Sequence, residues 1–195
     1  MLKRTLIAAA VALASAGAFA QTTSATTTQR DVNQQTRIEN GLKDGSLTTR
    51  EAAKLEKEES RVDHMQAKAL KDGKLSDAER AKLNAAQNKV SADIKAERHD
   101  AQTGNPNSAS SKRMQADVQR NINQEKRIQA GVQNGSLTNR EAGKLEAGQA
   151  RVDRKEAIAG RDGHVNSLEQ ASVQRSENRQ SKRIHRQKHD AQTRG

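Results

Sequence analysis

Two histidines near the C-terminus have the spacing of a metal-binding pair. His185 and His189 are four residues apart, so on a helix their imidazoles share one face. Neutral imidazole is a good ligand for zinc and copper. A complete site needs further ligands from another helix or another chain, and His64 and His164 are the candidates. The competing interpretation is a solvated pair on a basic helix, whose neighbouring charges would repel a cation.

Four turn segments resemble part of a calcium-binding loop. Residues 72–79, Asp-Gly-Lys-Leu-Ser-Asp-Ala-Glu, match the second half of an EF-hand loop. The first half does not match in any copy, because its first and third ligand positions lack the carboxylates that a hard cation requires. In the first copy these positions hold Asn40 and Leu42. We therefore interpret the segments as capped turns that resemble degenerate EF-hands, and we do not expect calcium there.

The C-terminal segment is strongly basic and has no apolar face. This pattern favours attraction to anionic groups at a surface over insertion into a membrane. The mature chain has no aromatic side chain to stack on bases, since Phe19 is the only aromatic residue, so we expect no specific nucleic-acid partner. The residues predicted to form this polyanion or partner surface are Arg175, Arg179, Lys182, Arg183, Arg186 and Lys188.

No arrangement of residues suggests an enzyme. The chain has no cysteine, which excludes thiolate metal sites, cysteine nucleophiles and disulfides. It also lacks a phosphate-binding loop, a cofactor signature and a nucleophile with an adjacent base. We expect a protein without enzymatic activity and without a cofactor, with zinc or copper as the alternative.

The elements that position these residues are helices joined by tight turns. In each turn a glycine follows Asp or Asn, as expected where a helix ends in a left-handed conformation. A cap residue and a Glu three positions later then form a capping box, as at Thr48 and Glu51. The spacing predicts helices over residues 29–43, 49–72 and 77–101, joined by short turns into a three-helix unit.

The three-helix unit occurs twice, because the sequence repeats at an offset of 90 residues. We predict a first helical repeat over residues 29–102, a linker over 103–111 and a second repeat over 112–195 with the basic C-terminal helix. Leu83 and Val90 are matched by Val173 and Gln180 in the second copy. We therefore expect the last helix to be weakly docked and the all-α protein to be partly flexible.

The N-terminus has the pattern of a secretory signal peptide. Residues 1–20 contain a basic start, a short apolar run and the end Ala-Phe-Ala, which predicts cleavage after Ala20 and a periplasmic or secreted protein. Residues 21–28 are rich in Thr and predict a disordered lead. No apolar run is long enough to span a membrane. The formal net charge of +11 suits acidic partners.

The repeated motif carries a resemblance. Arg-Ile-x-x-Gly-x-x-x-Gly-x-Leu-Thr-x-x-Glu-Ala at residues 37–52 and 127–142 resembles a group of uncharacterised secreted proteobacterial proteins. The Leu-Thr-x-x-Glu segments are also weakly similar to the LTxxQ motif of periplasmic stress proteins, with Glu in place of Gln. These resemblances imply an envelope location, and the second implies chaperone-like or zinc-responsive roles.

The sequence therefore predicts a non-enzymatic periplasmic protein with a binding or protective, chaperone-like role. Its basic helical surface would contact acidic or unfolded proteins or envelope polyanions, and the chain could form a homo-oligomer. One alternative is a zinc- or copper-binding accessory or resistance protein that uses His185 and His189. Another is a polyanion-binding or purely structural stress-induced protein.

Overall fold

Six α-helices make up the part of the chain that the structure, a computed structural model, describes, which is residues 15–190 with side chains from residue 24 onward. The helices are α1 (Ser15–Asp44), α2 (Thr49–Ala69), α3 (Asp77–Glu97), α4 (Ala109–Gln133), α5 (Asn139–Ala159) and α6 (Ser167–Lys188). No strand occurs in these residues, and the predicted all-α class is confirmed. Most of the predicted signal peptide, residues 1–14, lies outside the described residues.

The turns have the predicted local chemistry. The glycines at positions 45, 73, 135 and 163 all have φ between 77° and 90°, the left-handed region in which glycine is not strained. A complete capping box opens each of α2, α3, α5 and α6. In the first, the Glu51 amide donates to the Thr48 hydroxyl over 3.2 Å, and the Thr48 amide donates to the Glu51 carboxylate over 2.8 Å. The turn carboxylates are thus used to cap helices.

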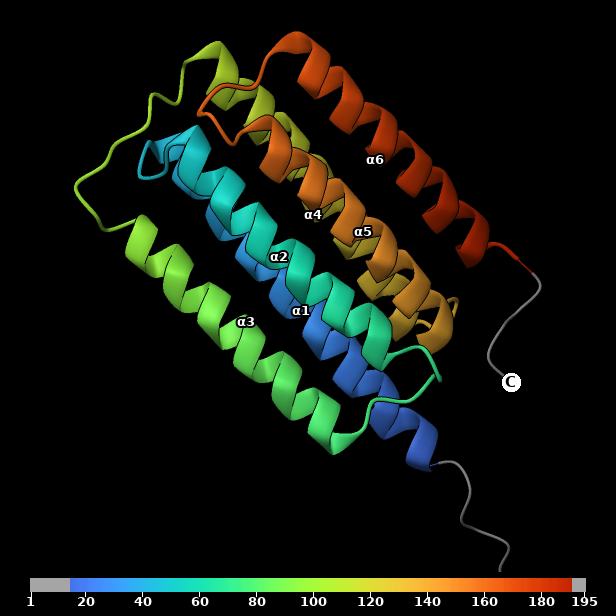
Figure 1. Cartoon of the computed structure of the whole chain (residues 1–195). Coiled ribbons are helices and arrows are strands. Elements are labelled where there is room, and N and C mark those ends of the chain that lie inside the picture. Colours follow the sequence, from blue (N-terminus) through green and yellow to red (C-terminus); the bar gives the residue numbers. More distant parts are fainter. Residues whose placement is uncertain (1–14, 191–195) are drawn as a thin grey trace, which may run out of the picture.

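The helices lie side by side with nearly aligned axes (Figure 1). α1, α2, α4 and α5 form the centre, α3 packs on α1 and α2, and α6 packs on α4 and α5. The most extensive contacts join the two halves of the chain, α2 to α5 and α1 to α4. Small residues bring α2 and α5 close together: a Cβ added at Gly160 would lie 2.8 Å from the Cβ of Ala53, and one at Gly143 would lie 2.8 Å from the Cβ of Leu70.

Two apolar clusters form the core, and each takes residues from both halves. The first joins Leu55 of α2 to Met114 of α4 and Val173 of α6. The second joins Leu70, just after α2, to Leu145 of α5. The first cluster extends along α2 from Ala52 to Val62, and the second includes Leu70, which directly follows the helix. The two repeats therefore share their core.

The structure differs from the sequence-based expectations at two places. The helix α1 begins at Ser15, so residues 21–28, predicted as a disordered lead, are helical, and Thr28 is fully buried against the bundle. The helix α6 is docked despite its poor apolar stripe. Gln180 is buried, its amide donates to the Leu145 carbonyl over 2.8 Å, and Gly148 leaves the space that its side chain occupies. A hydrogen bond thus replaces the contact that Val90 makes in the first half.

None of the helices in residues 15–190 combines the length and apolar character needed to cross a membrane.

Equivalent side-chain contacts occur in the two halves of the chain. The Arg37 guanidinium donates to the Ser91 hydroxyl over 2.7 Å, and Arg127 donates to Ser181 over the same distance, 90 residues further on. The outer helices α3 and α6 are therefore held by equivalent hydrogen bonds.

Candidate metal centre

The two most central helices carry matching polar stripes. Positions 56, 59, 63 and 66 of α2 and positions 146, 149, 153 and 156 of α5 follow a 3-4-3 spacing, which places each set on one helix face. These residues are Glu56, Glu59, Asp63 and Gln66 in α2, and Glu146, Gln149, Asp153 and Glu156 in α5. Both faces turn inward, since every one of these side chains is buried. The buried faces of α2 and α5 are therefore polar over residues 56–66 and 146–156.

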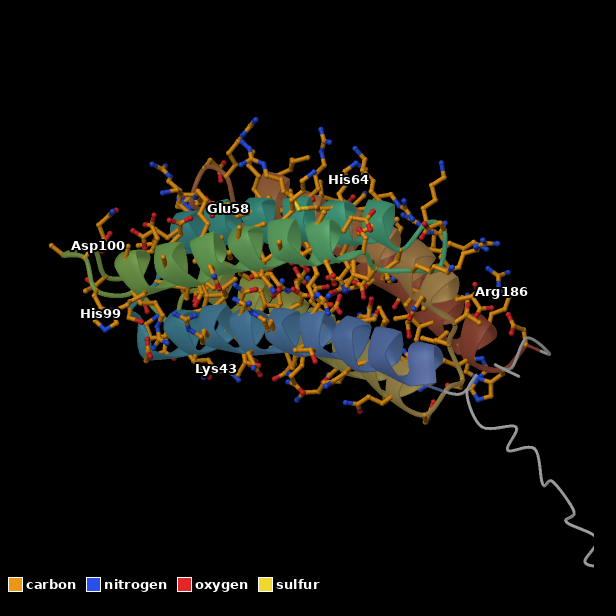
Figure 2. All side chains as sticks on the ribbon, turned by 90° about the horizontal axis from the view of Figure 1, so that it is seen from below. Lys43, Glu58, His64, His99, Asp100 and Arg186 are labelled. Atoms are coloured by element: carbon orange, nitrogen blue, oxygen red, sulfur yellow. The ribbon has the colours of Figure 1, made fainter. Side chains whose placement is uncertain are left out.

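Carboxyl groups dominate this region, which we call the acidic centre. Each of its eight carboxyl side chains is at most 3% exposed. They are Asp31, Glu56, Glu59, Asp63, Glu125, Glu146, Asp153 and Glu156. None of them forms an ion pair with a described Lys, Arg or His, and no Lys or Arg is among the buried described side chains. Figure 2 shows the oxygen-rich side chains between the helices, while Lys43, His64 and Arg186 project outward.

Two groups of carboxylates in the acidic centre converge closely enough to hold a metal ion. In the first, oxygens of Asp31, Asp63 and Glu146 lie within 4.8 Å of one another. In the second, oxygens of Glu56, Asp153 and Glu156 also lie within 4.8 Å of one another. We call these groups triad 1 and triad 2. Each combines side chains from helices of both halves, so neither exists without the packing of α2 against α5.

A side-chain amide accompanies each triad. The Asn121 amide donates to Asp153 over 3.0 Å and to Glu156 over 2.8 Å, which directs this fully buried side chain into triad 2. Gln66, also fully buried, hydrogen bonds to Glu146 of triad 1 and donates to the Thr28 hydroxyl over 3.2 Å. Their amide nitrogens are satisfied, but the carbonyl oxygens of Asn121 and Gln66 have no hydrogen-bond partner in the described chain.

Several carboxylate oxygens of the acidic centre also lack a donor in the described chain. Each of the two triads contributes two such atoms, and Glu59 and Glu125 contribute others. The triad oxygens that accept no nitrogen or hydroxyl donor are Asp31 Oδ2, Glu146 Oε2, Glu56 Oε1 and Glu156 Oε1. A hydrogen bond joins the carboxyl groups of Glu56 and Glu156, which requires a proton on one of them. Leaving buried acceptors without donors is costly, about 1–3 kcal/mol for each neutral group and more for a charged one. Cations or protons are the species that satisfy such oxygens.

Burial strongly perturbs the acidity of these groups. Desolvation raises the pKa of Asp31 to about 7 and that of Glu56 to about 7. Desolvation, reinforced by neighbouring carboxylates, raises the pKa of Glu125 and Asp153 well above the ordinary range. A hydrogen bond joins the carboxyl groups of Asp63 and Asp153, which requires one shared proton, because two carboxylates cannot donate to each other. The acidic centre therefore holds protons at neutral pH unless a cation replaces them.

The ligand set selects a class of metal. Both triads and their amides offer only oxygen atoms, and no nitrogen or sulfur ligand joins them. Carboxylate and amide oxygens suit hard cations such as Ca²⁺, Mg²⁺ and Mn²⁺. When ionised, the three carboxylates of a triad carry three negative charges, which one trivalent ion, or one divalent ion together with one proton, neutralises. The residues thus fit hard divalent or trivalent cations.

The histidines that the sequence singled out lie elsewhere. The rings of His185 and His189 stack with centroids 4.3 Å apart and planes at 18°, and His189 Nδ1 lies 2.7 Å from the His185 carbonyl oxygen. His64 on α2 and His164 in the turn before α6 are exposed. No group of three converging ligands within residues 15–190 contains a histidine. The zinc or copper site on His185 and His189 stays a prediction, without a third ligand from the described residues.

The predicted basic surface divides into two parts. Arg179 and Arg183 of α6 line a groove against α5 together with Arg151 and Lys155. The other four predicted residues, Arg175, Lys182, Arg186 and Lys188, do not line this groove. The Lys188 ammonium donates to the Arg127 carbonyl over 3.3 Å. The adjoining groove between α2 and α5, about 640 Å³ in volume, was not predicted from the sequence and is also basic.

The acidic centre was not predicted from the sequence. One signal was present. Within each helix four acidic or amide residues follow a 3-4-3 stripe that contains no basic residue, whereas Lys54, Lys57 and Arg61 fall on other positions. A solvated face normally mixes both signs, so separation of the signs around a helix indicates that the acidic stripe has a different environment.

The fold and the site define an all-α bundle with a buried acidic centre and a basic exterior. No family model matches the chain, and neither the curated proteins nor the solved structures include one with significant similarity to it. Function must therefore be argued from the site itself.

Proposed function

We propose that this protein binds hard divalent or trivalent cations in the acidic centre, and that it does so in the cell envelope. The observation that carries this proposal is the burial of eight carboxyl groups without a cationic partner, several of whose oxygens have no donor in the described chain. If all eight groups were ionised without a counterion, the cost would exceed the 5–15 kcal/mol that typically stabilises a domain, so each charge must be compensated by a proton or by a cation. Bound cations would compensate these charges. The signal-like pattern of residues 1–20 supports the envelope location.

Thermal melts followed by circular dichroism test this proposal. We expect Ca²⁺, Mn²⁺ or La³⁺ to raise the melting temperature of the chelator-treated protein at pH 7.5. An ion at 100 times its dissociation constant adds about 2.7 kcal/mol, which is roughly 5–10 °C for a protein of this size. Binding should also release protons, because the carboxyl groups must ionise to act as ligands.

Two double variants distinguish the acidic centre from the histidine pair. Asp63→Asn with Asp153→Asn should abolish the shift, whereas His185→Ala with His189→Ala should leave it intact. A shift with none of the hard cations contradicts the proposal, and so does a shift that survives the Asn substitutions. A shift with zinc or copper alone that is lost in the histidine variant would favour the accessory-protein alternative.

The basic grooves favour a second function, contact with polyanions or acidic partners. Arg61 and Arg154 line the groove between α2 and α5, together with Lys57 and Arg161. These four side chains form no ion pair with a described carboxylate. Guanidinium groups bind phosphate and carboxylate bidentately. We propose this groove, with Arg179 and Arg183 beside it, as the binding surface that the sequence placed on the C-terminal helix alone.

Binding of fluorescently labelled linear polyphosphate tests this second function. The triple variant Arg61→Gln, Arg154→Gln and Arg161→Gln should weaken binding at least tenfold and reduce its salt dependence. The matched control is Lys71→Gln, Lys74→Gln and Lys82→Gln, which removes the same charge from exposed positions outside the grooves. Equal weakening by both variants would show that net charge alone attracts the polyanion.

A further inference from the structure

The acidic centre contains two triads whose members correspond through the 90-residue offset of the sequence. Asp63 corresponds to Asp153, and Glu146 corresponds to Glu56. Each triad therefore contains one Asp and one Glu from equivalent positions of the two halves, with the Glu coming from the opposite half.

At the two remaining ligand positions, the carboxylate and the amide are interchanged between the two halves. Asp31 in the first half corresponds to Asn121, and Gln66 corresponds to Glu156. Triad 1 thus has its third carboxylate on the α1 position and its amide on the α2 position. Triad 2 has the amide on the equivalent α4 position and the carboxylate on the equivalent α5 position. The two halves differ in residue type at these two positions, but each triad still has three carboxylates and one accompanying amide.

The hydrogen bonds of the two amides support the assignment of one amide to each triad. In triad 2 the Asn121 amide nitrogen donates to two carboxylates, and its oxygen has no partner in the described chain. In triad 1 the Gln66 oxygen is likewise unpartnered. The nitrogen of the Asn121 amide faces the carboxylates, so rotation of the amide group about its last side-chain bond would bring the oxygen, a ligand for a hard cation, to the same place. Each triad therefore has a neighbouring amide that would supply a fourth ligand after this rotation.

We propose that the acidic centre holds two hard cations per chain, one at Asp31, Asp63, Glu146 and Gln66 and the other at Glu56, Asp153, Glu156 and Asn121. This inference rests on the proposed cation-binding function and adds its stoichiometry and ligand sets. The hydrogen bond between Asp63 of the first ligand set and Asp153 of the second connects the two sets. Three carboxylates per site match the charge of one trivalent ion.

Counting bound ions tests the two sites separately. After equilibrium dialysis against Mn²⁺, Ca²⁺ or La³⁺ at pH 7.5, elemental analysis should find two ions per chain for each cation that stabilises the protein. Asp31→Asn should remove only the first site, and Glu156→Gln should remove only the second. Each variant should therefore bind one ion, and the two substitutions together should leave none. Glu58→Gln, which alters a carboxylate outside both triads, should still bind two.

A rescue variant separates the loss of a ligand from damage to the fold. Adding Gln66→Glu to Asp31→Asn gives the first site the ligand pattern of the second, and two ions should bind again. Circular dichroism should show native helix content in all variants. Two ions in the wild type with rescue supports the inference. A single ion in the wild type, or two ions in both single variants, overturns it while cation binding stands. No bound ion overturns the proposed function itself.

Discussion

Metal-free protein is expected to lose most of its stability as the pH rises from about 5 to 8. The carboxyl groups of the acidic centre have a raised pKa in the folded state, so between their unfolded and folded pKa values the folded state binds more protons. Stability therefore falls with increasing pH. For Asp31, whose pKa is raised by burial from 3.8 to about 7, the loss is on the order of 4 kcal/mol. Several such groups together would exceed the stability of a typical domain.

Urea titrations at a series of pH values, with chelator present, measure this loss. Below about pH 4 an opposite effect enters. The hydrogen bond from Lys89 lowers the pKa of Asp93, so this surface interaction is lost in acid. We therefore expect greatest stability near pH 4–5. The double variant Asp63→Asn and Asp153→Asn should show a shallower decline, because these side chains no longer ionise. A stability that increases from pH 5 to pH 8 in chelator would contradict the burial of these carboxyl groups.

Replacing Leu55 by Ala is expected to destabilise the whole bundle by about 2–5 kcal/mol, because the substitution leaves a cavity among packed side chains. Leu55 is fully buried in the cluster that joins both halves. The melting temperature should fall by roughly 5–15 °C, and the melt should keep a single transition. The measurement is a thermal melt by circular dichroism at pH 5, where the acidic centre is protonated.

Leu168→Ala is the matched control. Leu168 is also a helical leucine, but it is 81% exposed on α6, so its removal should change stability by less than about 0.5 kcal/mol. If the Leu55→Ala melt separated into two transitions with only one displaced, the two repeats would have independent cores. A single displaced transition would support the shared core.

Local features were predictable because they depend on neighbouring residues. The capping box of Thr48 and Glu51 needs only two side chains three positions apart, and the left-handed glycines need only a turn. The start of α1 was not predictable in this way. Thr-rich residues 21–28 have weak helix propensity, but Thr28 is buried against the bundle and its hydroxyl lies 3.3 Å from Glu146. A tertiary contact thus overrides local preference.

The candidate site likewise depends partly on local sequence and partly on tertiary packing. The sequence alone determined an all-α chain of two similar units, with capped helices and a basic, aromatic-free composition, because helix periodicity and turn chemistry are local. Only the tertiary structure decided that α2 packs against α5 and that their acidic stripes face each other. Asp63 and Glu146 are far apart in the chain, and nothing in their local sequence states that they meet. Their convergence depends on the close approach at Gly143 and Gly160, which turns two charged helix faces into one buried acidic centre.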